Sequence, residues 1–176
     1  DKYHILDTED LKLAKENYQL IISILDLHHI NDVIGNFIQI RNSLTERGAF
    51  IASFLGGESF KELREAGLAA DNQLNQFSPK IAPFIDVKMT GQLLARAKYH
   101  MPVTDSDFLK LEYKKIDKLF LDIQNLIEGN ILAEKRQNLI SKNHLKLIKD
   151  KYLENSGPNA IIELTLEIIN ITAFKN

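Results

Sequence analysis

Two apolar runs on either side of one amphipathic segment constrain the fold of this chain more than any other feature. The runs are Tyr18–Leu25 and Ala49–Leu55, and runs of this length are typical of strands buried on both faces of a sheet. Between them, Asn31 and Asp32 are candidate N-caps for a helix whose apolar residues recur at helical spacing over Val33–Leu44. Strand, helix and strand with short connections form a crossover unit, so we expect two parallel, neighbouring strands in an α/β sheet.

Further helix signals follow along the chain. Gly48 is expected to end the first helix, and Ser59 and Asp86 are expected to cap two later helices. Residues 71–83 are polar and contain two prolines, which predicts a loop. For residues 101–113 the sequence leaves strand and irregular structure open.

The last third of the chain predicts two helices and a strand. Apolar residues recur at helical spacing over 116–127, and another helix is expected after Ser141. Apolar and polar residues alternate over 162–168, which is typical of a strand with one solvated face, and a change of phase at Ile168–Ile169 predicts a bulge. The length fits one domain, so residues 1–176 are expected to form a single domain.

Composition excludes several classes of function. A formal net charge of -2 argues against a nucleic-acid partner, because binding phosphates needs an excess of Lys and Arg. The absence of cysteine excludes disulfides, thiolate nucleophiles and cysteine-bound zinc. No apolar run reaches the roughly 18 residues that a transmembrane helix needs, so we expect no membrane span, and we expect no secretory signal in the first residues given.

Five segments carry a resemblance to a known family. Asp7–Leu11, Tyr18–Ser23 and Leu44–Gly48 resemble the acidic turn after the third strand, the fourth strand, and the turn before the fifth strand of class I S-adenosylmethionine-dependent methyltransferases. Gly56–Arg64 and Phe77–Phe84 resemble motifs of a narrower group, the methyltransferase-like complex I assembly factors (arginine hydroxylases) and their α-proteobacterial relatives. The resemblance to the malonyl-carrier methyltransferases of biotin synthesis is more distant.

The resemblance implies an α/β, incomplete Rossmann-like methyltransferase fold. We expect a mostly parallel sheet with helices on both faces and an antiparallel C-terminal strand, with the family's first two strands missing. The family's glycine-rich turn and ribose-binding acid would both precede Asp1, so S-adenosylmethionine is expected to bind an intact parent and to bind this chain weakly or not at all. The strand Tyr18–Leu25 would then have an open hydrophobic edge, to be covered by a missing N-terminal segment or by a homodimer mate.

The resemblance also implies cofactor-binding residues. Asp7 could accept a hydrogen bond from the adenine amino group, and Thr8 could supply a backbone donor. Ser23, Leu25 and His28 stand where the strand ends over the cofactor in the family, at the carboxyl edge where open α/β sheets bind ligands. The alternatives are a solvated turn for Asp7, a small core residue for Ser23 and a general base for His28.

Four residues are candidates for binding the substrate. Arg64 could contact it from the helix after the glycine pair, or could form a surface ion pair with Glu62. Ser78, Pro79 and Phe84 could form a rigid loop over the substrate cleft, or a packed connection. The resemblance assigns no catalytic residue.

A metal site is not expected. His28 and His29 are adjacent, so their side chains point apart, and no ligand spacing accompanies them. His29 stands where the family usually has tryptophan.

The sequence leaves two kinds of function open. The first is a cofactor-dependent methyltransferase-like enzyme that modifies a side chain of a protein client, with arginine in respiratory complex I assembly as the suggested target. The second is a non-catalytic binding or assembly module, or an inactive remnant of a split methyltransferase gene. Family analogy implies a bacterial cytoplasmic or a mitochondrial matrix location.

Overall fold

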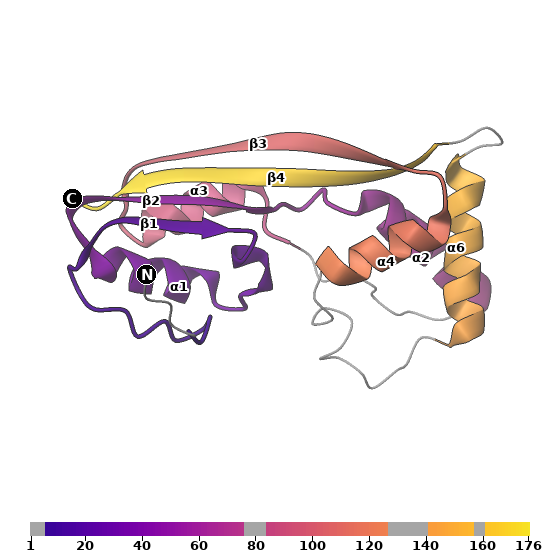
Figure 1. Ribbon diagram of the computed structural model, residues 1–176, viewed down its shortest axis with the longest axis horizontal. Coiled ribbons are helices and arrows are strands. Elements are labelled where there is room, and N and C mark those ends of the chain that lie inside the picture. The colour runs from indigo at the N-terminus through magenta and orange to yellow at the C-terminus, as the bar shows by residue number, and fades with distance from the viewer. Residues whose placement is uncertain (1–5, 76–83, 127–140, 157–160) are drawn as a thin grey trace. The chain divides into compact units, whose positions relative to one another are not determined.

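The computed structural model describes residues 6–75, 84–126, 141–156 and 161–176 (Figure 1). Predictions for Ser78 and Pro79, and for residue 127 at the end of a predicted helix, lie outside these residues. The described elements are, in order, β1 (Tyr18–Ile24), the 3-10 helix η1 (Leu27–His29), α1 (Val33–Ser43), β2 (Leu44–Leu55), α2 (Lys61–Leu74), α3 (Val87–Arg96), β3 (His100–Tyr113), α4 (Ile116–Leu126), α6 (Lys142–Ser156) and β4 (Ile162–Phe174).

The strands form one mixed sheet of order β1-β2-β4-β3 (Figure 1). β1 pairs parallel to β2, with Leu20 opposite Ala49 and Ile24 opposite Ser53. β4 pairs antiparallel to β2, so the C-terminal strand returns between β2 and β3. The predicted α/β class, the parallel crossover pair and the antiparallel C-terminal strand are therefore confirmed.

The chain divides into two compact units. Unit 1 comprises Asp1–Gly57, Phe84–Asp107 and Glu167–Asn176, and unit 2 comprises Glu58–Pro83 and Phe108–Leu166. The long strands β3 and β4 contribute residues to both units. The expectation of a single domain stays a prediction.

Three aromatic rings form the centre of the unit 1 core. The ring of Phe50 lies 5.9 Å from that of Phe37 and 5.9 Å from that of Tyr99, measured between centroids. The Tyr99 hydroxyl donates to the carbonyl oxygen of Phe37 at 3.1 Å. Buried aliphatic residues of η1, α1, β2, α3 and β4 complete this core: Leu27, Ile40, Leu44, Leu94, Ile169 and Ile171.

The helix caps of unit 1 follow the sequence signals. The Asp32 carboxylate accepts a hydrogen bond from Gly35 N at 2.9 Å at the start of α1, and the Asp86 carboxylate accepts one from Met89 N at 2.6 Å at the start of α3. Both predicted caps are confirmed. The prediction that α1 ends at Gly48 was wrong. The helix ends at Ser43, and β2 follows directly.

The predictions for α2 were wrong at both ends. Its N-cap residue is Phe60, in the left-handed conformation with φ 61°, and not Ser59. Its C-terminal end is Leu74, beyond the expected loop start at Asp71. Asp71 is buried in unit 2, where one carboxylate oxygen lies 2.8 Å from His144 Nε2 of α6, and this tertiary contact accounts for the longer helix.

Unit 2 packs α2 against α6 and anchors α6 to β4. His144, Ile148 and Tyr152 form the buried face of α6. The Tyr152 hydroxyl donates to the carbonyl oxygen of Glu163 at 2.6 Å. The predicted helices at 116–127 and after Ser141 are thus present as α4 and α6.

The expected burial of both faces of β1 was wrong. Leu20, Ile22 and Ile24 are 48%, 56% and 69% exposed, whereas Ile21 packs against the unit 1 core. β1 is an edge strand of the described sheet, and the described residues cover only the face that carries Ile21.

The expected solvated face of β4 was also wrong. Thr165 and Glu167 are 2% and 5% exposed. Thr165 donates to the Glu62 carboxylate through both its backbone N–H and its hydroxyl. The predicted bulge is absent from the pairing with β2, which runs without a shift from Ile168 to Phe174.

Membrane-spanning helices are absent from the part of the chain that the structure describes, because no helix there is long and apolar enough to cross a bilayer.

Candidate functional site

The carboxyl ends of the parallel strands β1 and β2 lie side by side in unit 1. After β1, Leu25 adopts a left-handed conformation with φ 54° while its N–H donates to Ser53 O of β2 at 2.7 Å. This turn directs the chain into η1, and Gly56 and Gly57 follow the neighbouring end of β2. Open α/β sheets bind ligands at this edge.

Aromatic rings from two distant segments meet at this edge. The His28 ring of η1 lies 5.6 Å from the Phe84 ring in an edge-to-face arrangement and 4.1 Å from the His29 ring, between centroids. Phe84 precedes α3, so the contact brings together a residue predicted to bind the cofactor and one predicted to bind the substrate.

The His28 imidazole makes no hydrogen bond with the described residues. Both ring nitrogens are buried, and neither has a hydrogen-bond partner among the described residues. Burial, followed by the charge of His29, lowers the pKa of His28 from 6.5 to about 4. The ring is therefore neutral at pH 7, with one donor and one acceptor. Leaving a buried nitrogen unpaired costs on the order of 1–3 kcal/mol, so this geometry favours a bound partner.

The glycine pair after β2 has a different role at each position. A Cβ atom on Gly56 would lie 2.6 Å from a carboxylate oxygen of Glu167, so a larger residue there would require the Glu167 side chain of β4 to shift. A Cβ atom on Gly57 would meet Phe84 O at 3.5 Å, an ordinary contact. The Glu167 side chain therefore limits residue size at the first position, whereas the second position has room for a methyl group in ordinary contact with Phe84.

The acidic turn is bound to the start of α1. The Glu9 carboxylate accepts hydrogen bonds from Asn31 N at 2.7 Å and from Asp32 N at 3.3 Å. Thr8 O accepts from Asn36 Nδ2 at 2.9 Å, and Asp7 Oδ1 accepts from Glu9 N at 2.9 Å. Sequence reasoning missed Glu9, because its partners lie more than twenty residues away and no local pattern marks them.

The remaining predicted site residues are distributed over both units. Ser23 is half-buried in β1 opposite Ala52, and the Leu25 side chain is 46% exposed. Arg64 belongs to α2 in unit 2, where its Nη1 donates to Ser59 O. Within the described ranges no three potential metal ligands cluster.

Comparison with curated proteins finds clear relatives. A Rickettsia prowazekii protein named as a methyltransferase is 34% identical over 149 residues, 83% of this chain and 65% of its own length. The mitochondrial arginine-hydroxylase NDUFAF5 of Dictyostelium discoideum is 32% identical over 160 residues, 89% of this chain and 36% of its own length. A malonyl-[acyl-carrier protein] O-methyltransferase of Gallionella capsiferriformans is 27% identical over 171 residues, 96% of this chain and 56% of its own length.

The chain therefore spans between 36% and 65% of the length of these relatives. No family model matches the sequence.

Solved structures show the same fold at low identity. The YcgJ protein of Bacillus subtilis superposes with a TM-score of 0.59 and 13% identity, over 96% of this chain and 68% of its own. Phosphoethanolamine N-methyltransferase 2 of Haemonchus contortus, in complex with S-adenosylhomocysteine, gives a TM-score of 0.50 and 14% identity, over 96% of this chain and 36% of its own.

Proposed function

This chain is homologous to S-adenosylmethionine-dependent methyltransferase-like proteins, and from that premise we propose that it acts as such a protein on a side chain of a protein client. The observation that carries the proposal is the pair of unpaired His28 nitrogens at the carboxyl edge of two parallel strands, beside Phe84. The finer proposal is that the target is an arginine, in respiratory complex I assembly. It is supported by the arginine-hydroxylase relative and by the motifs at Gly56–Arg64 and Phe77–Phe84.

The residues proposed to hold the cofactor fit the adenosine end of S-adenosylmethionine. A neutral His28 offers one donor and one acceptor, which suits a heteroaromatic base. Asp7 keeps one carboxylate oxygen that accepts no hydrogen bond from the described residues, so it can receive an amino group. Thr8, Ser23 and Leu25 complete the proposed set.

In this proposal the bound cofactor supplies an electrophilic methyl group, and the residues of this chain position the reactants. His28 has a pKa of about 4 and is a weak base at neutral pH, so its proposed role is to orient a ligand and not to remove a proton. Arg64, Ser78, Pro79 and Phe84 are proposed to contact the client.

A titration with S-adenosylhomocysteine tests the proposal. We expect millimolar affinity for the chain by ¹H–¹⁵N NMR, with shifts gathered at the backbone amides of Thr8, Leu25 and His28. His28→Ala should remove the shifts, whereas Asp150→Asn on the exposed surface of α6 should leave them unchanged. Shifts located elsewhere would refute the assignment of this edge as the cofactor site, whereas no shift at 10 mM ligand (roughly ten times the expected millimolar Kd) would assign cofactor binding to an intact parent alone.

A further inference from the structure

The Glu9 carboxylate joins the acidic turn of unit 1 to the chain segment that follows η1. One oxygen, Oε1, accepts hydrogen bonds from Asn31 N at 2.7 Å and from Asn31 Nδ2 at 3.0 Å. The other oxygen, Oε2, accepts one from Asp32 N at 3.3 Å. Hydrogen bonds to a carboxylate are stronger than those between neutral groups. Because Glu9 is exposed, these bonds and not burial are its main contribution to the structure.

Two side chains of α1 hold the backbone of the same turn. The Gln39 amide spans the turn, because its Nε2 donates to Glu9 O at 2.9 Å and its Oε1 accepts from Leu11 N at 2.9 Å. Asn36 is 2% exposed, and its Nδ2 donates to Thr8 O at 2.9 Å. Asn36 and Gln39 are three residues apart, so both lie on one side of the helix. The turn is therefore attached to α1 both along the helix and at its start.

The orientation of Asp7 depends on these attachments. Asp7 Oδ1 accepts from Glu9 N at 2.9 Å, and Asp7 has no other hydrogen bond or ion pair among the residues that the structure describes. Its second oxygen is the acceptor proposed above for an amino group of the ligand. The direction of that oxygen therefore follows the position of the Glu9 backbone, which the Glu9 carboxylate and the Gln39 amide hold in place.

The Glu9 carboxylate also acts close to η1, the other part of the proposed site. η1 ends at His29, and Asn31 lies two residues beyond it. Ile30, between them, is 7% exposed and belongs to the unit 1 core, which limits the movement of this segment. Glu9 is therefore bound to a residue only three positions from His28, on a segment that the core holds in place.

We propose that Glu9 is a positioning residue for the carboxyl edge, because it holds Asp7 and Thr8 in a fixed position relative to η1, which carries His28. Glu9 contacts no ligand in this proposal, since both of its oxygens accept hydrogen bonds from the start of α1. Groups that are held in place bind a ligand at a lower entropic cost, so loosening the turn should weaken binding. The inference rests on the proposed function for the identity of the ligand, and its first test needs no ligand.

Backbone order parameters from ¹⁵N relaxation of the 176-residue chain test the inference without a ligand. We expect order parameters of about 0.85 at Asp7 and Thr8 in the wild type, falling below about 0.6 in Glu9→Ala. Glu9→Gln keeps one acceptor oxygen for Asn31 and should give intermediate values. The amides of α1 should stay ordered in both variants, because the buried residues of that helix are unchanged.

A titration with S-adenosylhomocysteine then tests the consequence for the site. Glu9→Ala should weaken the millimolar wild-type affinity roughly five-fold or more, and Glu9→Gln roughly two-fold. Asp10→Ala is the matched control. It removes a neighbouring carboxylate of the same turn, which lies 3.3 Å from the exposed Lys12 Nζ, and should leave the order parameters and the affinity unchanged.

Three results would overturn the inference. The first is a turn that stays ordered in Glu9→Ala, and the second is a loss of order that extends through α1, since either shows that Glu9 does not act on the turn in particular. The third is an unchanged affinity in Glu9→Ala although the order parameters of the turn have fallen. A wild-type chain that binds no S-adenosylhomocysteine bears on the proposed function alone, and the order parameters then decide whether Glu9 positions the turn.

Discussion

Replacing His28 by leucine should stabilise the chain, because it removes two buried nitrogens that lack partners. Relief of an unpaired buried group contributes about 1–3 kcal/mol. The loss of the ring contacts with His29 and Phe84 costs about 0.5–1.5 kcal/mol. The expected net gain in the free energy of unfolding is therefore about 1 kcal/mol at pH 7.5.

The same substitution should flatten the pH dependence of stability. His28 has a pKa of about 4 in the folded chain and about 6.5 when unfolded. Between these values the unfolded chain binds more protons, so wild-type stability falls as the pH is lowered from 6.5 to 4. A displacement of this size corresponds to about 3 kcal/mol for a group wholly removed from water, and partial exposure reduces it to about 1–2 kcal/mol.

Urea unfolding followed by circular dichroism between pH 4.5 and 7.5 measures both effects. The wild-type and His28→Leu curves should lie closest above pH 6.5 and diverge as the pH falls. His29→Leu is the control, because it retains the buried nitrogens of His28. A His28→Leu chain that is less stable at every pH, or one whose difference from wild type does not change with pH, would refute the assignment of His28 as a neutral, unpaired group.

Two further predictions concern packing. Gly56→Ala should destabilise the chain by about 1–3 kcal/mol, since the new methyl would lie 2.6 Å from the Glu167 carboxylate, whereas Gly57→Ala should change stability by less than about 0.5 kcal/mol; thermal melts of both variants compare them. His144→Ala should cost about 2–4 kcal/mol in the free energy of unfolding, because it opens a cavity and removes a partner of the buried Asp71 carboxylate; a urea midpoint equal to that of wild type would contradict this.

Local signals allowed the sequence to predict much of unit 1. Asp32 and Asp86 are caps because each carboxylate reaches a backbone N–H three residues later, a contact that spacing alone reveals. The parallel pairing of β1 and β2 follows from two apolar runs joined by one helix. The motif resemblance then predicted which residues lie at the carboxyl edge of the sheet, including His28 and Phe84.

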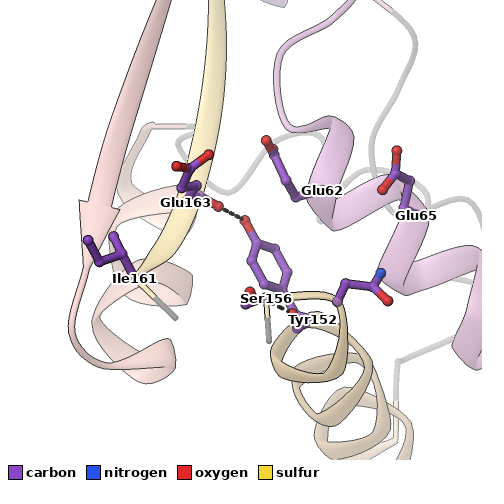
Figure 2. Close-up of a pocket in the computed structure, with 7 residues that line it drawn as sticks. Glu62, Glu65, Tyr152, Ser156, Ile161 and Glu163 are labelled. Atoms are coloured by element: carbon purple, nitrogen blue, oxygen red, sulfur yellow. Dashed lines mark hydrogen bonds between the residues drawn. The ribbon is translucent and has the colours of Figure 1, made fainter. Parts of the chain in front are cut away.

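Contacts between distant segments explain the parts that the sequence did not predict. α2 continues through Asp71 because its carboxylate meets His144 of α6, more than seventy residues later in the chain. Thr165 is buried because its N–H and hydroxyl bind Glu62, which lies 103 residues before it. A pocket lined by Glu62 of α2, Tyr152 of α6 and Glu163 of β4 likewise combines distant segments, so no single segment signals it (Figure 2).

The exposed face of β1 shows a different limit of sequence reasoning. A run with apolar residues on both faces predicts a cover over both faces of a strand, and Ile21 is covered by the unit 1 core. Ile22 and Ile24 remain 56% and 69% exposed, and Ile51, opposite Ile22 on β2, is 40% exposed. The apolar residues of a strand therefore show that both of its faces are suited to packing. The exposed fractions of their side chains show which face the described residues cover. The face of the β1–β2 pair that carries Ile22, Ile24 and Ile51 therefore has apolar surface that the described residues do not cover, next to the edge that carries His28.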